Sequence, residues 1–422
     1  MSRPAIDDLT VRCAHLIPMH GPAIENGWVR IRRGKIVALG GGGRADSGGT
    51  TVIDAGDAIV IPGLVNAHTH LEFSDTPTPL DATGGLPEWI GRVVALRRSR
   101  AADEGHADRG CSAIRAGLAE SAAAGVTAIG EIATSAPADA YAASGPRIRF
   151  FREALGLSPT AGREALRSCI RDISRLAARS VAVGLSPHAP YSVAAPLGAA
   201  VIAEAIRRQV PVAMHIAESL AEEQLIASGG GPFRELLEGF GAWDAESPPT
   251  LLPAAEWISR LARASRGIVV HGTHLDRDPV ALARLARHRD RLCVAVCPRT
   301  TLALSGTLPP VSSFRDSRIR VAIGTDSRAS APDLSILAEC RTLVDAGVVT
   351  PAEALGMATR HGAWALGFER CSGMLAQGRP ADLVILRPAT GHRDPHDAVL
   401  DPATRVLATL RAGKVIAGSL DH

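Results

Sequence analysis

Two patterns of apolar and polar positions alternate along the middle of the chain. Short runs that are almost entirely apolar are followed by longer segments in which apolar residues return every three or four positions. The first pattern is typical of strands buried on both faces of a parallel sheet, and the second of helices that cover the sheet. The predicted strands are 59–70, 126–131, 148–153, 181–186, 210–217, 268–271, 292–298 and 320–326, and the predicted helices include 162–179, 197–208, 254–264 and 279–288.

Strands that alternate with helices in this way predict a TIM-like (β/α)8 barrel, because each parallel neighbour needs a crossover connection. The two ends of the chain show a different pattern from the central region. Each end carries a hairpin pattern, at 28–39 and at 406–417, and a glycine-rich loop at 40–49 follows the first one. Because the second hairpin mirrors the first, we expect the two ends to form one composite β-sandwich. The predicted domains are 1–60 and 369–422 for the two parts of the sandwich and 61–368 for the barrel.

The first barrel strand ends in a pair of histidines. In an extended strand, side chains two positions apart point to the same face, so His68 and His70 project together. The pair lies at the carboxyl end of the strand, where barrels of this type gather their catalytic groups. Two imidazoles are half of a metal site, but ordinary polar residues at a strand end would give the same pattern. Further ligands are needed to decide.

Three later strands end in suitable residues. The fifth ends with His215 and Glu218, the sixth with His271 and the eighth with Asp326. Neutral imidazoles with one carboxylate suit a catalytic divalent metal that keeps room for a water, Zn²⁺ first and Fe²⁺ second. A lone histidine at a strand end is more often structural, but such residues on separate strands at the same rim predict a metal site.

Composition narrows the class of protein. The chain has 422 residues, of which 46% are hydrophobic and 21% charged, and its net charge is only +3. No basic block is interleaved with aromatic residues, and no apolar stretch approaches membrane-spanning length. The seven cysteines are scattered and are expected to be reduced thiols. We therefore expect a cytoplasmic protein with a small-molecule substrate and without nucleic-acid or membrane partners. A homo-oligomer is compatible with the sequence.

Five motifs together resemble the amidohydrolase superfamily of metal-dependent barrels, and in particular its mononuclear nucleobase and nucleoside deaminase branch. The motifs are PGLVNAHTH at 62–70, SPHAPYS at 186–192, HIAE at 215–218, VHGTHL at 270–275 and GTDS at 324–327. The resemblance covers nearly the whole chain. It implies that His68, His70, His215 and Asp326 bind the metal, that Glu218 shuttles protons and that His271 orients the nucleophile.

The lysine content favours a single metal ion. Binuclear members of the superfamily generally bridge their metals with a carboxylated lysine on a barrel strand. The only lysines here are Lys35 and Lys414, both in the terminal segments. One metal per chain is the simpler interpretation, although Glu131 at the end of the second strand remains a candidate for a glutamate bridge.

The predicted chemistry is hydrolytic removal of ammonia. A metal lowers the pKa of its bound water toward neutrality, and Asp326 can both ligate the metal and accept a hydrogen bond from this water. Glu218 is placed to relay a proton to a ring nitrogen of the substrate. The alternative for Glu218 is a carboxylate at a helix start, because a helical pattern begins at 219–222.

Predicted substrate contacts are less well defined. His188 and Tyr191 lie in a proline-flanked loop, and Glu72 follows His70 closely enough to bind a ribose hydroxyl. Trp89 is a candidate wall of a loop at 84–90, and Arg152 a candidate anchor for a substrate carboxylate. Local packing or a solvated charge explains these last two residues equally well.

Residues 71–74 after the histidine pair most resemble deaminases of aminodeoxyfutalosine, on a menaquinone route. Thr301 departs from the pattern, since relatives often carry asparagine there. The alternatives are deamination of S-adenosylhomocysteine, adenosine or guanine, hydrolysis of a cyclic amide or a carbon–halogen bond, and a non-catalytic barrel scaffold. The Gly- and Pro-rich segment 229–253 is expected to form a loop over the site.

Overall fold

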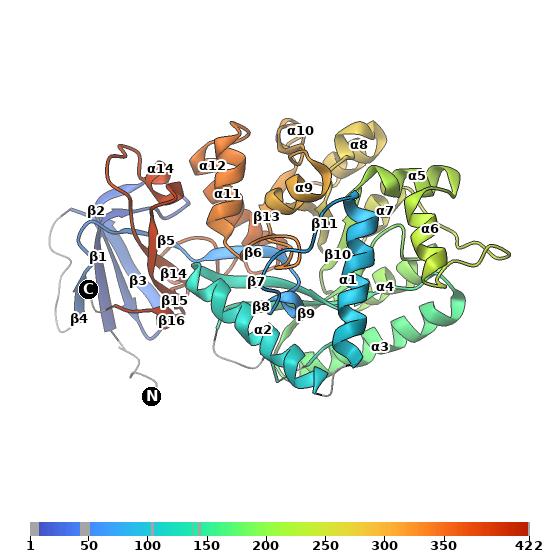
Figure 1. The fold of residues 1–422 in the computed structure, drawn as a ribbon. Helices are drawn as coiled ribbons and strands as arrows, with labels where there is room; N and C mark the ends of the chain where they lie inside the picture. Colours follow the sequence, from blue (N-terminus) through green and yellow to red (C-terminus); the bar gives the residue numbers. More distant parts are fainter. Residues whose placement is uncertain (1–7, 43–50, 103–104, 138, 142–144, 421–422) are drawn as a thin grey trace.

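Two sheets organise the chain, one from its centre and one from both of its ends (Figure 1). The computed structural model describes residues 8–42, 51–102, 105–137, 139–141 and 145–420. Most of the predicted glycine-rich loop at 40–49 lies outside these residues. The predicted fold class, a (β/α)8 barrel with a β-domain formed by both termini, is confirmed. The exact domain boundaries stay predictions.

The barrel sheet follows the order of the chain from its first strand to its last. Its strands are β6 (Leu64–Thr69), β7 (Val126–Ala133), β8 (Arg147–Ala154), β9 (Ala182–Pro187), β10 (Val212–Ile216), β11 (Gly267–His271), β12 (Leu292–Val296) and β13 (Arg320–Ile323). A parallel bridge between Thr69 and Asp326 joins the end of β6 to the residues after β13. The backbone N–H of His70 donates to the Asp326 carbonyl at 2.8 Å. These contacts bring the barrel close to full closure.

Helices surround the barrel, and the last helix of the chain lies beside the terminal sheet (Figure 1). They are α1 (Gly85–Ala102), α2 (His106–Ala123), α3 (Pro159–Ala178), α4 (Ala195–Arg208), α5 (Leu220–Ser228), α6 (Pro232–Gly239), α7 (Ala254–Leu261), α8 (Pro279–Arg287), α9 (Pro298–Ser305), α10 (Val311–Asp316), α11 (Ile336–Asp345), α12 (Pro351–Gly356), α13 (Gly362–Ala365) and α14 (Pro395–Leu400). Short turns of helix are η1 (Leu71–Phe73), η2 (Leu275–Arg277) and the π-helix η3 (Met357–His361). In the described part of the chain, no helix combines the length and apolarity needed to span a membrane.

The terminal sheet has the order β16-β15-β14-β5-β1-β2-β3, with β4 paired to β1. Its strands are β1 (Asp8–Leu16), β2 (Ile24–Arg32), β3 (Lys35–Gly41), β4 (Thr51–Asp54), β5 (Ile59–Pro62), β14 (Leu383–Arg387), β15 (Arg405–Arg411) and β16 (Lys414–Gly418). The two hairpin turns approach each other so closely that a Cβ on Gly34 would lie 2.5 Å from the Ala412 carbonyl oxygen. The predicted mirrored hairpins therefore meet in one small domain.

Two details differ from the sequence prediction. The apolar run at 59–70 is two strands, since β5 pairs with β1 and β14 while β6 starts the barrel. The break falls at Pro62-Gly63, where a Cβ on Gly63 would collide with Thr127. The segment 229–253 is not all loop, because α6 forms within it. Pro232 starts α6, and Phe233 and Leu237, four residues apart, bury one side of it.

Candidate metal centre and active site

His68 and His70 lie together at the carboxyl end of β6. His68 is fully buried, and the ring centroids of the two histidines are 5.0 Å apart. Their Nε2 atoms lie 3.6 and 3.7 Å from Oδ1 of Asp326, which follows β13. The pairing between the first and last strands of the barrel thus places these three side chains side by side.

The remaining predicted ligand joins the same cluster from the opposite strands. The His215 ring on β10 is centred 5.0 Å from the His68 ring, and the His271 ring at the end of β11 is 5.5 Å from it. Two sets of donor atoms within 4.8 Å of one another include His68: His68 with His70 and Asp326, and His68 with His215 and His271. The barrel rim therefore gathers all the residues predicted to surround a metal.

The hydrogen bonds of this cluster leave metal-binding atoms free. No described residue bonds to either ring nitrogen of His68 or to Nδ1 of His70, although these atoms are buried. His215 donates from Nδ1 to the His188 carbonyl at 2.9 Å, which leaves its Nε2 lone pair available. Ser330 donates to Oδ2 of Asp326 at 2.6 Å and leaves Oδ1 to the histidines. Buried polar atoms without partners are costly, and a divalent cation would satisfy one nitrogen of the His68 ring. The residues fit such a metal.

The protonation states also suit a cation. Burial lowers the pKa of His70 and of His215 well below the usual value, so both imidazoles are neutral. Burial alone would raise the pKa of Asp326, but the nearby imidazoles of His68, His70 and His271 hold it below its usual range. Neutral imidazoles with an ionised carboxylate are the forms that bind metal.

Glu218 and His271 are in contact beside this cluster. Oε1 of Glu218 lies 3.2 Å from Nε2 of His271, and both residues are buried. Burial, reinforced by the charge of Asp326, raises the pKa of Glu218 well above its usual value, and burial lowers the pKa of His271 to about 3. A protonated carboxyl group and a neutral imidazole therefore share this contact. Glu218 precedes α5, whose N-cap is Ser219, and so lies outside the helix.

Two of the predicted substrate residues lie at the cluster. The His188 ring is centred 4.9 Å from the His215 ring, and its Nδ1 lies 2.5 Å from the Ser192 hydroxyl. The Tyr191 ring is 5.5 Å from the His188 ring and stacks on Phe233 of α6 at 3.9 Å. Part of the long segment between β10 and β11 thus packs directly against this side of the site.

Glu72 and Trp89 lie further out. Glu72 accepts a hydrogen bond from Arg97 of α1 at 2.7 Å. Trp89 is buried in α1, where its Nε1–H donates to the Ala329 carbonyl at 3.3 Å. The predicted loop at 84–90 is thus mostly the first turn and a half of α1, which starts at Gly85, the second of two glycines with positive φ. Trp89 packs in the same apolar cluster as Tyr191.

Arg152 does not reach the cluster. Its Nε donates to Asp172 of α3 at 2.8 Å, and its other nitrogens bond to Ser168 and to the Glu153 carbonyl. The next residue, Glu153, points toward the cluster instead, because successive side chains of a strand face opposite sides. Glu153 is 2% exposed, its Oε1 has no hydrogen-bond partner among the described residues, and it lies 4.0 Å from Nε2 of His188. Burial raises the pKa of Glu153 to about 7.

Sequence reasoning missed both Glu153 and Arg97. Glu153 forms a third group of potential ligands with His188 and His215. It ends the strand 148–153 in the sequence, so its position at the rim was the available signal. Burial alone would lower the pKa of Arg97, but Glu72 and Glu153 together raise it. Nothing in the sequence pairs Arg97 with Glu72.

Glu131, the candidate bridge between two metals, is engaged elsewhere. Its carboxylate accepts the Leu71 N–H at 3.0 Å and the Tyr141 hydroxyl at 3.2 Å. None of the ligand groups found among the described residues includes it. Burial raises the pKa of Glu131 well above the usual value. A second metal at this position would therefore have to displace a proton from this carboxyl group.

Comparison with known proteins gives the family. The profile of the Amidohydrolase family matches residues 59–416. A 5-methylthioadenosine/S-adenosylhomocysteine deaminase of Moorella thermoacetica is 28% identical over 414 residues, which cover 94% of this chain and 89% of the relative. Aminofutalosine deaminase of Helicobacter pylori, solved with methylthio-coformycin, superposes with a TM-score of 0.81 at 23% identity, over 97% of this chain and 100% of that one. Atrazine chlorohydrolase of Arthrobacter aurescens TC1, solved with zinc, superposes with a TM-score of 0.76 at 21% identity, over 98% of this chain and 96% of that one. The two solved structures share the fold, and the profile match establishes that the chain belongs to the Amidohydrolase family.

Proposed function

We propose that this protein is a metal-dependent hydrolytic deaminase of an adenine-type nucleoside. The observation that carries the proposal is the 3.2 Å contact between Glu218 and His271 beside three histidines and an aspartate with free metal-binding atoms. Hydrolytic removal of an amino group from an aromatic ring needs an activated water and a group that moves protons. The similarity over most of its length to a deaminase of adenine nucleosides supports this assignment.

His68, His70, His215 and Asp326 would hold the metal. The nitrogen-rich donor set favours Zn²⁺, with Fe²⁺ as the second choice, and zinc in a solved structure of the same fold supports that order. When bound, such a metal lowers the pKa of a coordinated water toward neutrality and polarises the bonds around the carbon that this water attacks. The same ligand set, without a lysine on the barrel strands, favours one metal per chain.

The protein's own groups would move the protons. Glu218, kept protonated by burial, donates to the ring nitrogen next to the carbon that carries the amino group. It then accepts one proton of the attacking water and passes it to the leaving amine, so that ammonia departs. The second proton of that water returns to Glu218 as the ring carbonyl forms, which restores the protonated carboxyl group. His271 is neutral and orients Glu218 and the water through Nε2. Asp326, held on its other oxygen by Ser330, accepts a hydrogen bond from the water.

Aminodeoxyfutalosine is our specific candidate for the substrate. A cavity of about 460 Å³ borders Glu72 and Arg97, and Arg100, Arg109 and Arg175 line it further. Such a cavity would suit the carboxylate end of this nucleoside, while Glu72 or Glu153 would bind ribose hydroxyls and His188 the ring. Arg152 is less suitable as the carboxylate anchor, because it does not line this cavity and Asp172 holds it away from the metal cluster.

The test is a substrate panel scored by ammonia release. It includes aminodeoxyfutalosine, adenosine, 5-methylthioadenosine, S-adenosylhomocysteine, guanine and a chlorinated triazine. We expect ammonia from adenine nucleosides, with aminodeoxyfutalosine giving the highest kcat/KM. Chloride release without ammonia would favour hydrolysis of a carbon–halogen bond, and guanine as the best substrate would change the ring assignment. Absence of turnover in metal-loaded protein on every substrate would favour a non-catalytic scaffold.

A further inference from the structure

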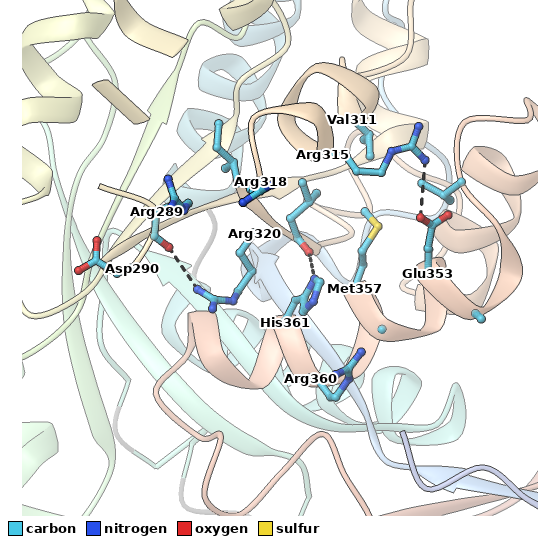
Figure 2. Close-up of a pocket in the computed structure, with 15 residues that line it drawn as sticks. Arg289, Asp290, Val311, Arg315, Arg318, Arg320, Glu353, Met357, Arg360 and His361 are labelled. Atoms are coloured by element: carbon cyan, nitrogen blue, oxygen red, sulfur yellow. Dashed lines mark hydrogen bonds and ion pairs between the residues drawn. The ribbon is translucent and has the colours of Figure 1, made fainter. Parts of the chain in front are cut away.

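A second cavity lies at the end of the barrel opposite the candidate metal cluster. Its volume is about 760 Å³, and its walls come from the residues before β12, from α10, from the start of β13 and the residues before it, and from α12 and η3 (Figure 2). Arg320 starts β13, whereas Asp326 follows the carboxyl end of that strand. At about 3.3 Å per extended residue, the two positions are on the order of 15–20 Å apart. The proposed deaminase site does not use this cavity.

Positive charge dominates the walls. Five arginines line the cavity against two acidic residues: Arg289, Arg315, Arg318, Arg320 and Arg360, with Asp290 and Glu353. Only one of these pairs is close, Arg315 with Glu353 at 3.6 Å. Arg289, Arg318 and Arg360 form no ion pair with any residue that the structure describes. Several guanidinium groups without an anion therefore surround one space.

The positions of these arginines are specific. Arg320 lies with its guanidinium 3.8 Å from the centre of the Trp364 ring and donates to the Arg289 carbonyl at 3.5 Å. Arg318 occupies the position after the α10 C-cap with φ at 55°, a left-handed conformation that favours glycine. Arg360 and His361 come from the π-helix η3, a rare element that is frequent at functional sites. In Figure 2, His361 and Met357 lie between the Arg289, Arg318 and Arg320 side and the Arg315–Glu353 pair.

The floor of the cavity is apolar and carries one hydrogen-bond acceptor. Val311, Ile319, Val321, Val349 and Met357 line it, and each is at least nine-tenths buried. The Nδ1–H of His361 donates to the Val321 carbonyl at 2.9 Å, so its Nε2 is left as an acceptor. Burial lowers the pKa of His361 to about 4, which keeps the ring neutral at physiological pH. An occupant would meet a cationic rim and an apolar base.

We propose that this cavity binds a phosphorylated small molecule with an apolar body, of the nucleoside polyphosphate class. Guanidinium groups bind phosphate oxygens in pairs of parallel hydrogen bonds, and several of them around one cavity suit several phosphates. The apolar floor suits a base or another flat ring. The volume lies within the range of small-molecule sites and exceeds what a single phosphate ion fills.

The test is calorimetric titration of the metal-loaded full-length protein with inorganic phosphate, inorganic tripolyphosphate and uridine triphosphate. Adenine nucleotides are left out because the proposed deaminase site would accept their ring. We expect uridine triphosphate to bind with one site per chain, more tightly than tripolyphosphate, which in turn binds more tightly than phosphate. In the double variant Arg318→Ala/Arg360→Ala, the affinity for uridine triphosphate should fall roughly tenfold or more.

A matched control is the double variant Arg163→Ala/Arg167→Ala. Both arginines are exposed on α3, so the net charge changes equally while the cavity stays intact. It should keep the wild-type affinity. The proposal is overturned if the wild-type protein shows no saturable binding of uridine triphosphate below millimolar concentration, or if the control weakens binding as much as the cavity variant. Binding that survives Arg318→Ala/Arg360→Ala unchanged, at the metal cluster or elsewhere, also overturns it.

Discussion

Replacing Glu218 by glutamine tests the proposed proton transfer directly. Glu218 is 8% exposed and touches His271 at 3.2 Å, so the amide fits the same space and keeps a hydrogen bond to the ring. It cannot deliver a proton to the substrate. General acid–base groups contribute about 10²–10⁴ in rate, and the barrier should rise by roughly 2.7–5.4 kcal/mol at about 1.36 kcal/mol per decade.

The assay measures kcat and KM for ammonia release together with metal content per chain. We expect Glu218→Gln to lower kcat by about 10²–10⁴ while metal content stays at the wild-type level, because Glu218 is not among the ligands. KM should change little, since the shape of the site is kept. Thermal unfolding, measured in parallel, checks that the variant is folded.

Glu222→Gln is the matched control. Glu222 is also buried and lies four residues further on, but its Oε1 accepts the Ala217 N–H at 2.7 Å and so supports the loop before Glu218. Glutamine keeps this acceptor, and kcat should stay within a few-fold of wild type. Near-normal turnover of Glu218→Gln with its metal retained would refute the proton-transfer role. An equal loss in Glu222→Gln would show that the effect is structural.

Three further predictions use other parts of the chain. Elemental analysis of the purified protein should find about one divalent metal per chain; two tightly held equivalents would contradict the single site and bring Glu131 forward. Arg152→Ala should lower the free energy of unfolding in urea by about 1.5–3 kcal/mol, because the mostly buried Asp172 loses its 2.8 Å bond and keeps only the longer contact with Arg175 at 3.4 Å; unchanged stability with a raised KM for carboxylated substrates would instead make Arg152 the carboxylate anchor. Burial raises the pKa of Glu222 to about 8 from 4.5, so ionising it destabilises the folded state progressively as pH rises through that window. The melting temperature of Glu222→Gln should therefore rise relative to that of the wild type between pH 5 and pH 8. A difference in melting temperature that stays constant over this range would count against this account.

The barrel and the clustering of the candidate metal ligands were predictable because they depend on short-range pattern. Apolar strands buried on both faces read as apolar runs, and the alternation that aligns His68 with His70 needs only two residues of extended chain. Closure of the barrel then places strand ends at one rim, so His215, His271 and Asp326 follow from their position at the ends of strands. These inferences do not depend on how the side chains around the strand ends pack.

The substrate side was harder because it depends on long-range pairing. Arg152 and Glu153 are adjacent on β8, and which of them faces the rim depends on a register that one residue reverses. Asp172, the partner that holds Arg152 outward, lies a helix away in α3. Glu72 looked free in the sequence because its partner Arg97 is 25 residues further along, on a helix that the pattern did not reveal. Such contacts are fixed by packing between helices and loops, which leaves no periodic signal.

The rim is also where the backbone is strained. Ala217, His271 and Asp326 have φ of 54°, 64° and 56°, values that cost of order 1–3 kcal/mol each for residues other than glycine. The groups that hold two of these residues are not ligands: Glu222 accepts the Ala217 N–H, and the Thr69 hydroxyl donates to the Asp326 carbonyl at 2.6 Å. The strain is therefore supported by the surrounding protein rather than by the metal. A candidate ligand set held in this way is preorganised, so less of the free energy of metal binding would be spent on ordering the rim and more of it would remain for affinity.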